Sequence, residues 1–297
     1  MNARHATLWM AAWLSLGPAV SNGFARFAYA LLLPPMRDDL GWTYTQAGSM
    51  NSFNAMGYLA GSLLAFHGVA VIGARRLFMA GMWVTSIALM LSGMTADFNL
   101  LAALRFAAGL SGAVVFIAGG ALAAALYPRD PSRSAAAIAI YFAGGGIGIV
   151  LPGITLPWLF ALRGNQAWPS AWIGMGAVAV AISLLCALTI APATAASAAP
   201  ADTPWKFRAF AALLAGYFLF GAGYIAYMTF IIAWMRDRGS GPEAVAATWG
   251  ALGLATVLAP RVWRRPIATW RGGRPAAACI LVLVAGASLP LFNTSLV

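Results

Sequence analysis

Residues 8–33 read LWMAAWLSLGPAVSNGFARFAYALLL, an apolar stretch that contains a single charged residue, Arg26. A helix needs about 20 apolar residues to cross a lipid bilayer. The stretch is too long for the apolar core of a signal peptide, even though Ala19-Val20-Ser21 resembles a cleavage site. It therefore predicts a first membrane-spanning helix.

The composition extends this prediction to the whole chain. Of 297 residues, 62% are hydrophobic and 8% are charged, and the mean hydropathy is +0.81. A soluble domain carries about 25% charged residues, so this chain has too little polar surface for a water-soluble globule. The same figures exclude a disordered chain, a collagen and a disulfide scaffold. Strands with alternating polarity are absent, so we expect an all-α polytopic membrane protein.

Glycine, proline and charged residues divide the sequence into nine predicted membrane helices. These are Leu8–Leu33, Tyr44–Phe66, Leu77–Ala96, Leu100–Leu126, Ala135–Leu159, Trp172–Ala191, Phe210–Trp234, Val245–Val262 and Ala276–Phe292. Residues 192–207 are rich in Ala, Pro and Thr and are predicted to form a cytoplasmic linker. This linker would separate a six-helix N-terminal half, residues 1–191, from a partial C-terminal half of three helices, residues 208–297.

The charges predict the orientation of the chain. Lysine and arginine number 18 against 7 acidic residues, which gives a net charge of +11. With the N-terminus inside, twelve of these cations fall in inner loops and four in outer loops, while Arg26 and Arg105 lie within spans. This distribution satisfies the positive-inside rule. The orientation in the membrane therefore explains the excess of basic residues without a nucleic-acid partner. We expect the lipid bilayer to be the main partner.

One short motif occurs twice. Met-Arg-Asp stands at residues 36–38 and again at residues 235–237, each time just past an aromatic-rich predicted helix and on the predicted outer side. The two copies are 199 residues apart, which is one six-helix unit. The recurrence indicates parallel repeats like the two halves of a transporter.

Arg26 is the most informative residue, because a charge inside a span costs about 2.5–3.5 kcal/mol. At helical spacing it shares a face with Asn22 and Tyr29, so this polar stripe is expected to face the bundle interior or a water-filled cavity. The alternative is an arginine that extends toward the membrane surface or satisfies backbone carbonyls. A guanidinium on a transport pathway would suit an anionic or carboxylate-bearing substrate.

Two further helices carry candidate residues. On the second span, polar side chains at helical spacing would contact substrate or hold helices together, and Gly57 with Gly61 permits close helix contact. The seventh span carries an aromatic row that would either pack or line a cavity. The candidates for the substrate pathway are Asn22, Arg26, Tyr29, Asn51, Asn54, Tyr58, Tyr217 and Tyr224.

No group of residues points to catalysis. The acidic residues fall in predicted loops or at span edges, and the sequence contains no HExxH, Ser-His-Asp or Walker A pattern. The two cysteines, Cys186 and Cys279, lie in apolar runs and form neither a metal-binding spacing nor a disulfide framework. We therefore expect no enzyme activity, no cofactor and no metal site.

The segment GFARFAYALLLPPM, Gly23–Met36, resembles the YbfB-type branch of the major facilitator superfamily (MFS). RFAAGLSGA, which begins at Arg105, is similar to the fourth-helix motif of the superfamily, whose arginine is associated with proton coupling. GARRLF, which begins at Gly73, matches the end of the superfamily's loop signature, with Arg75 and Arg76 as its basic residues. Ala70 stands near the position where that signature has an aspartate.

The glycine-rich fifth span is similar to the antiporter motif of the superfamily. The matching positions are Gly144, Gly148, Pro152 and Gly153. Together with Gly73, Arg75 and Arg76, these residues are candidates for a role in gating or conformational change.

The resemblance implies a bacterial inner-membrane protein with a cytoplasmic N-terminus, a monomer in its full-length form. Two six-helix halves would alternate access to a site near the midplane. The implied function is secondary active transport of a small organic solute, and the fourth-helix arginine leaves proton coupling open. The alternative is a truncated, transport-inactive membrane protein or an assembly partner, because nine of the usual twelve helices are predicted.

Overall fold

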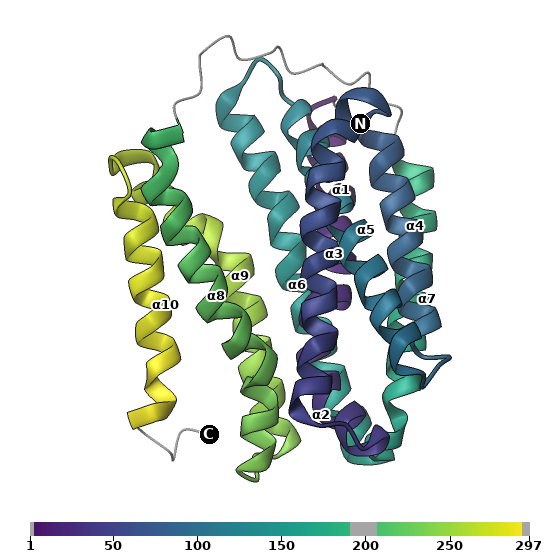
Figure 1. The fold of residues 1–297 in the computed structure, drawn as a ribbon. Coiled ribbons are helices and arrows are strands. Elements are labelled where there is room, and N and C mark those ends of the chain that lie inside the picture. The colour runs from purple at the N-terminus through teal and green to yellow at the C-terminus, as the bar shows by residue number, and fades with distance from the viewer. Residues whose placement is uncertain (1–2, 191–206, 293–297) are drawn as a thin grey trace.

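The computed structural model describes residues 3–190 and 207–292, and every regular element within these ranges is a helix. The helices run up and down through a bundle (Figure 1). In chain order they are α1 (Ala3–Pro18), η1 (Ala19–Phe27), α2 (Tyr29–Leu40), α3 (Tyr44–Val71), α4 (Ala74–Ser92), α5 (Phe98–Ala125), α6 (Pro131–Arg163), η2 (Asn165–Ala167), α7 (Trp168–Thr189), α8 (Phe207–Asp237), α9 (Pro242–Thr269) and α10 (Arg274–Phe292). The predicted all-α fold is confirmed.

Each of the nine predicted spans corresponds to a helical segment in the described part of the chain. Seven segments, α3 to α6, η2 with α7, α8 and α9, are long and apolar enough to cross a membrane. The first predicted span consists of α1, η1 and α2, which follow one another without a loop, and the last is the shorter apolar helix α10. The predicted linker, residues 192–207, lies outside the described residues except for Phe207. The division into halves therefore stays a prediction.

A π-helix, η1, interrupts the first span in its middle. At its end, the backbone N–H of Ala28 donates to the carbonyl of Gly23 at 2.9 Å, five residues back, so the turn is wider than in an α-helix. Pro18 precedes η1 and has no backbone N–H to donate. The first span thus changes its helical phase at its centre.

Arg26 and Tyr29, which sequence spacing assigns to one face, have different aromatic neighbours. Arg26 lies over the ring of Tyr58 on α3, whereas Tyr29 is buried against Trp172 and donates its hydroxyl to the carbonyl of Ala47, also on α3. The shared face of Arg26 and Tyr29 stays a prediction.

Glycines allow α3 and α5 to touch backbone to backbone. A Cβ atom at Gly57 would lie 2.0 Å from the carbonyl oxygen of Phe106, and one at Gly61 would lie 2.1 Å from that of Leu110. Only a hydrogen atom fits at such positions. The close contact expected from this glycine pair is therefore confirmed.

Helix α6 uses its glycines on two sides. Cβ atoms at Gly144 and Gly148 would lie 1.8 Å from the carbonyl oxygen of Ser15 and 2.2 Å from that of Ala19, on the first span. On another side, a Cβ at Gly146 would lie 2.5 Å from the carbonyl oxygen of Gly253 on α9. Helix α6 therefore joins the first span to the C-terminal helices.

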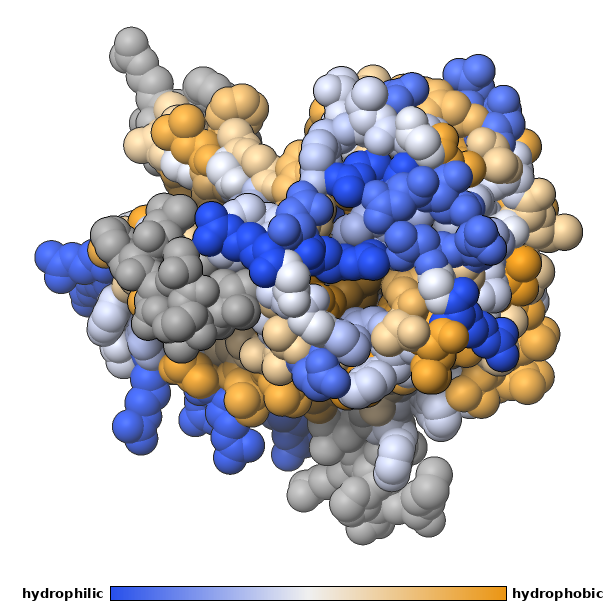
Figure 2. Space-filling model, turned by 90° about the horizontal axis from the view of Figure 1, so that it is seen from below, coloured by the Kyte–Doolittle hydropathy of each residue, from blue (hydrophilic) through white to orange (hydrophobic). Residues whose placement is uncertain are grey.

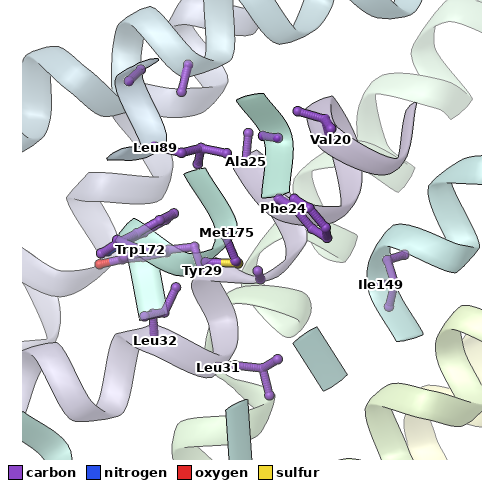
Figure 3. Close-up of a cluster of buried hydrophobic side chains, with 14 of the residues drawn as sticks. Val20, Phe24, Ala25, Tyr29, Leu31, Leu32, Leu89, Ile149, Trp172 and Met175 are labelled. Atoms are coloured by element: carbon purple, nitrogen blue, oxygen red, sulfur yellow. The ribbon is translucent and has the colours of Figure 1, made fainter. Parts of the chain in front are cut away.

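A buried core holds η1 and α2 against α7 (Figure 3). The rings of Tyr29 and Trp172 stack with centroids 6.5 Å apart, and Phe24 and Met175 belong to the same buried cluster. Burying a large apolar side chain contributes about 1.5–3 kcal/mol. This core fixes the position of η1, the element that carries Arg26.

Helix α8 packs against the N-terminal helices along its C-terminal part. Thr229, Ile232 and Met235 are buried, whereas Leu214 and Phe218, nearer the start of α8, are exposed. Figure 1 shows the corresponding arrangement, in which α8 lies close to the other helices near the lower end and diverges from them toward the upper end. The two groups of helices are thus joined at the lower end and separated at the end where the chain begins.

Candidate functional site

Arg26 lies in a small chamber between the first span and α8. We call it the Arg26 chamber, and it is lined by Arg26, Phe27, Ala30, Asn51, Tyr224, Ile225, Met228 and Thr229. The free space inside it is about 20 Å³, roughly enough for one water molecule. Both groups of helices contribute to its walls, so a movement of α8 changes its size.

The guanidinium of Arg26 contacts aromatic rings. Its central carbon lies 4.9 Å from the ring centre of Tyr58 on α3 and 5.9 Å from that of Phe27. Within the described ranges, no carboxylate forms an ion pair with Arg26. A cation–π contact uses the face of the guanidinium and leaves its N–H groups available to an acceptor.

Contacts of α8 with α3 and with the first span bound the chamber on both sides. Toward the lower end, Asn51 donates its Nδ2–H to Oγ1 of Thr229 at 2.5 Å. Toward the start of α8, the rings of Phe27 and Tyr224 meet edge to face at 6.3 Å. Tyr217 lies further toward the open end and is 72% exposed. Its ring contacts Phe220, which in turn stacks on Tyr224.

Arg105 occupies a separate, fully packed site. It is 2% exposed, and its Nη1–H donates to the carbonyl oxygen of Ala25 at 2.6 Å. Its guanidinium carbon lies 4.7 Å from the ring centre of Tyr29 and 5.4 Å from that of Trp172. Nε and Nη2 have no hydrogen-bond partner in the described part of the chain. Because Ala25 directly precedes Arg26, the two arginines lie at a similar depth in the bundle.

Two of the candidate pathway residues connect helices instead of lining the Arg26 chamber. Tyr29 donates its hydroxyl to the carbonyl of Ala47 at 2.6 Å, and Asn54 donates Nδ2–H to the backbone carbonyl of Arg105 at 3.0 Å. Asn22 on η1 is half-buried, and its Oδ1 has no partner among the described residues. Hydrogen bonds of this kind hold helices in register inside a membrane.

A cluster of polar side chains joins the two groups of helices at the lower end. We call it the closing cluster, and it consists of Arg37, Asp38, Tyr44, Asn165, Arg236 and Asp237. Figure 2, which views this end from below, shows a broad hydrophilic patch across the surface.

Asp237 at the end of α8 is the acceptor for the first part of the closing cluster. Arg37 on α2 lies 3.8 Å from it, and Tyr44 on α3 donates its hydroxyl to it. Arg37 also lies over the ring of Tyr44, 4.2 Å from its centre. These contacts bind the start of α3 and the end of α2 to α8.

Asn165 connects the second part of the closing cluster. Its Oδ1 accepts a hydrogen bond from Arg236 at 3.0 Å, and its Nδ2–H donates to Asp38 at 3.0 Å. Each Arg-Asp pair of the repeated motif therefore contacts the other group of helices, either directly or through Asn165. The two copies of the motif, far apart in sequence, meet in space.

The residues of the superfamily loop signature lie at the opposite end of the bundle. Gly73 adopts a φ of +91° immediately before α4. Arg75 donates Nε–H to the carbonyl oxygen of Ile190 at 2.9 Å, and Arg76 is exposed. A cation suits this place because the last carbonyls of a helix lack intrahelical partners and carry partial negative charge.

The antiporter-like positions are all buried on α6. Gly144 and Gly148 pack on the first span, and Gly153 lies against Trp249 of α9. Pro152 is buried on the same helix. These contacts place the motif where α6 meets both neighbours, and its gating role stays a prediction.

Sequence reasoning missed Thr229 and Asn165. Thr229 is the single serine or threonine in the sequence of α8, and Asn165 follows Gly164 in a predicted outer loop, on the same side as the repeated motif. These two features of the sequence were the ones that could have identified Thr229 and Asn165 as site residues. Their partners could not be predicted, because each contact joins segments more than 70 residues apart.

The structure is a bundle of membrane-length helices in two groups, which are joined at one end and enclose the Arg26 chamber between them. This architecture defines the chain as a polytopic membrane protein. Within this class, the chain belongs to the family described as uncharacterised MFS-type transporter YbfB, whose model matches residues 18–297. No curated protein matches the chain.

Solved structures of MFS transporters share the fold. A bacterial homologue of the human lysosomal transporter Spinster, in an inward-facing and unoccupied conformation, superposes with a TM-score of 0.66 at 17% identity. The match covers 88% of this chain and 64% of that one. Tetrameric PepTSo2 gives a TM-score of 0.55 at 20% identity, covering 94% of this chain and 58% of that one. The chain thus spans less than two thirds of the length of these transporters.

Proposed function

We propose that the chain acts in secondary active transport of a small organic solute by alternating access. The observation that carries this proposal is the arrangement around Arg26: the closing cluster joins the helices below the chamber, while the exposed start of α8 leaves them apart above it. A site that is reached from one side at a time is the requirement for alternating access.

The charge distribution supports an orientation for this state. Arg129 lies in the connection between α5 and α6, at the open end. Arg75 and Arg76 lie in the first turn of α4, and Arg133 lies in the first turn of α6, at the same end. By the positive-inside rule, this end faces the cytoplasm. The state would then be inward-facing, like that of the Spinster homologue. We place the chain in a bacterial inner membrane with its N-terminus in the cytoplasm.

Arg105 is proposed to couple movements of η1 and α5. It bridges the two elements by its hydrogen bond to Ala25, at the turn where the π-helix ends. Within the described ranges no acidic residue contacts it, so the proton-coupling role implied by the superfamily motif rests on that resemblance alone.

The proposal is tested by measuring distances at both ends of the bundle. Spin labels would be attached at Thr45 and Glu243 for the lower end, and in separate samples at Arg76 and Ala212 for the upper end; all four positions are exposed. The native cysteines would be replaced by alanine. Asp237→Ala removes the partner of Arg37 and Tyr44, and Arg238→Ala, at the next position, is the matched control.

With alternating access, Asp237→Ala lengthens the lower-end distance and shortens the upper-end distance, while Arg238→Ala changes neither. A lower end that opens while the upper end keeps its distance would contradict alternating access. Unchanged distances at both ends would favour the alternative of a transport-inactive membrane protein.

A further inference from the structure

The charge inside the bundle is unbalanced. Within the described ranges, Arg26 and Arg105 lie in the interior of the helices, whereas the acidic residues stand at helix ends or in the adjoining turns. Those acidic residues are Asp38, Asp39, Asp97, Asp130, Asp237 and Glu243. The region around the Arg26 chamber therefore has a positive potential that no described carboxylate offsets.

Of the two arginines, Arg26 is the one that a ligand can reach. Arg105 is 2% exposed and is enclosed by Tyr29, Trp172 and the carbonyl of Ala25, so no space remains for a solute beside it. Arg26 is half-buried and lines the chamber, and its described contacts are the ring faces of Tyr58 and Phe27. A half-buried guanidinium inside a membrane span is more favourable when an acceptor binds it.

The remaining walls are mostly apolar or aromatic. Phe27, Tyr224 and Met228 line the chamber, while Asn51 and Thr229 are hydrogen-bonded to each other. One cationic group among apolar surfaces selects a solute with one acidic group and an apolar body. A planar carboxylate matches the parallel N–H groups of a guanidinium.

We propose that the solute is a small organic anion whose acidic group binds Arg26 and whose apolar body lies between Tyr58 and Tyr224. This inference rests on the proposed transport function. The free space of about 20 Å³ is smaller than such a solute, so binding requires α8 to move outward. The anion would then neutralise Arg26 and draw the first span and α8 around it, which makes closure of the chamber depend on a bound solute.

The test measures the potential in the chamber with a cysteine at position 228. Met228→Cys is made in the full chain with both native cysteines replaced by alanine, and the protein is placed in nanodiscs of neutral phosphatidylcholine. Its rates of modification are compared for anionic sulfonatoethyl and cationic trimethylammonioethyl methanethiosulfonate. The ratio of the two rates is divided by the ratio for free 2-mercaptoethanol, which cancels the intrinsic reactivities of both the reagents and the thiol.

With Arg26 present, we expect the corrected rate ratio to favour the anionic reagent at least about tenfold. The positive potential raises the rate of the anionic reagent and lowers that of the cationic one, so both effects increase the ratio. Arg26→Gln should remove most of this preference. Arg76→Gln, at the exposed open end, is the control and should leave it unchanged. A ratio near one with Arg26 present, or a preference that survives Arg26→Gln, would overturn the anion assignment while leaving transport intact.

A thiol that reacts with neither reagent would have a different meaning. It would show that molecules of the size of these reagents do not reach the chamber, which contradicts the proposed transport site itself and therefore also the inference built on it. Reaction with both reagents at comparable rates, by contrast, would contradict the anionic solute but not the proposed transport site.

Discussion

Arg26 and Arg105 are two arginines within the same bundle whose surroundings give them different roles. Arg105 donates to the carbonyl of Ala25 and is enclosed by two aromatic rings, which is the environment of a structural cation. Arg26 contacts ring faces beside a chamber and keeps N–H groups that no described acceptor uses. Residue type alone does not distinguish these two roles.

The structural role of Arg105 predicts a loss of stability on truncation. Arg105→Ala leaves the Ala25 carbonyl without its donor and a cavity beside Tyr29, at a combined cost of about 2–4 kcal/mol. The free energy of unfolding, measured by titration with sodium dodecyl sulfate, checks this value. Arg76→Ala, at an exposed position, is the control, and equal stabilities of the two variants would refute the structural role.

At the scale of elements, α6 is the helix that joins the first span to α9. Its glycines at positions 144 and 148 admit the carbonyls of the first span, while position 146 admits α9. Glycine inside a soluble helix destabilises it by about 1 kcal/mol relative to alanine. In this bundle that loss is offset by backbone contacts that a larger side chain would prevent.

Adjacent glycines on α6 allow a direct test of these contacts. Gly144→Ala places a Cβ 1.8 Å from the Ser15 carbonyl oxygen, whereas a Cβ at Gly145 would have Pro18 Cβ as its nearest neighbour, at 3.8 Å. We expect Gly144→Ala to lower the unfolding free energy by about 2 kcal/mol or more and Gly145→Ala to leave it unchanged or raised. Thermal unfolding in detergent measures both variants, and a similar melting temperature for the two would contradict the close contact between α1 and α6.

The whole molecule combines a crossing of α6 with α9 and the closing cluster. The crossing brings Gly146 and Gly253 together near the middle of the bundle, and the closing cluster lies at the lower end. A close contact between crossing helices can serve as the point about which they rotate. Polar contacts at one end that break and re-form can hold one state closed. The arrangement therefore permits the C-terminal helices to tilt as a group.

Substitution at the crossing should loosen α9 selectively. A Cβ at Gly253 would lie 2.5 Å from Val150 Cγ2 and 2.8 Å from the Gly146 carbonyl oxygen, while Gly250, one turn earlier on α9, has no atoms within 4 Å of such a Cβ. Gly253→Ala should accelerate amide hydrogen exchange in residues 245–257 about tenfold. Gly250→Ala should not accelerate it. Mass spectrometry of the exchanged peptides gives the answer, and no difference between the variants would argue against a pivot at this crossing.

Much of this architecture could be predicted from the sequence. Within the described residues, the apolar runs located the seven membrane-length helices, the interrupted first span and the shorter α10, and the Gly57–Gly61 spacing identified a close helix contact. The repeated Met-Arg-Asp motif pointed to two matching segments at one end of the bundle. The first two predictions succeed because they depend on local hydropathy or on spacing along a single helix, and the third depends on a repeat that the sequence shows directly.

The sequence by itself determined the class of the protein, its spans and the presence of a charge inside the first of them, since lipid accepts only apolar helices with satisfied backbones. The tertiary structure decided what each polar group contacts. It showed the π-turn in the middle of the first span, the role of Asn54 and Tyr29 in packing, and the placement of Asn165 between both copies of the motif. Such contacts join residues far apart in the chain, and a small change of helical phase moves a side chain from one neighbour to another. Periodicity alone does not contain that information.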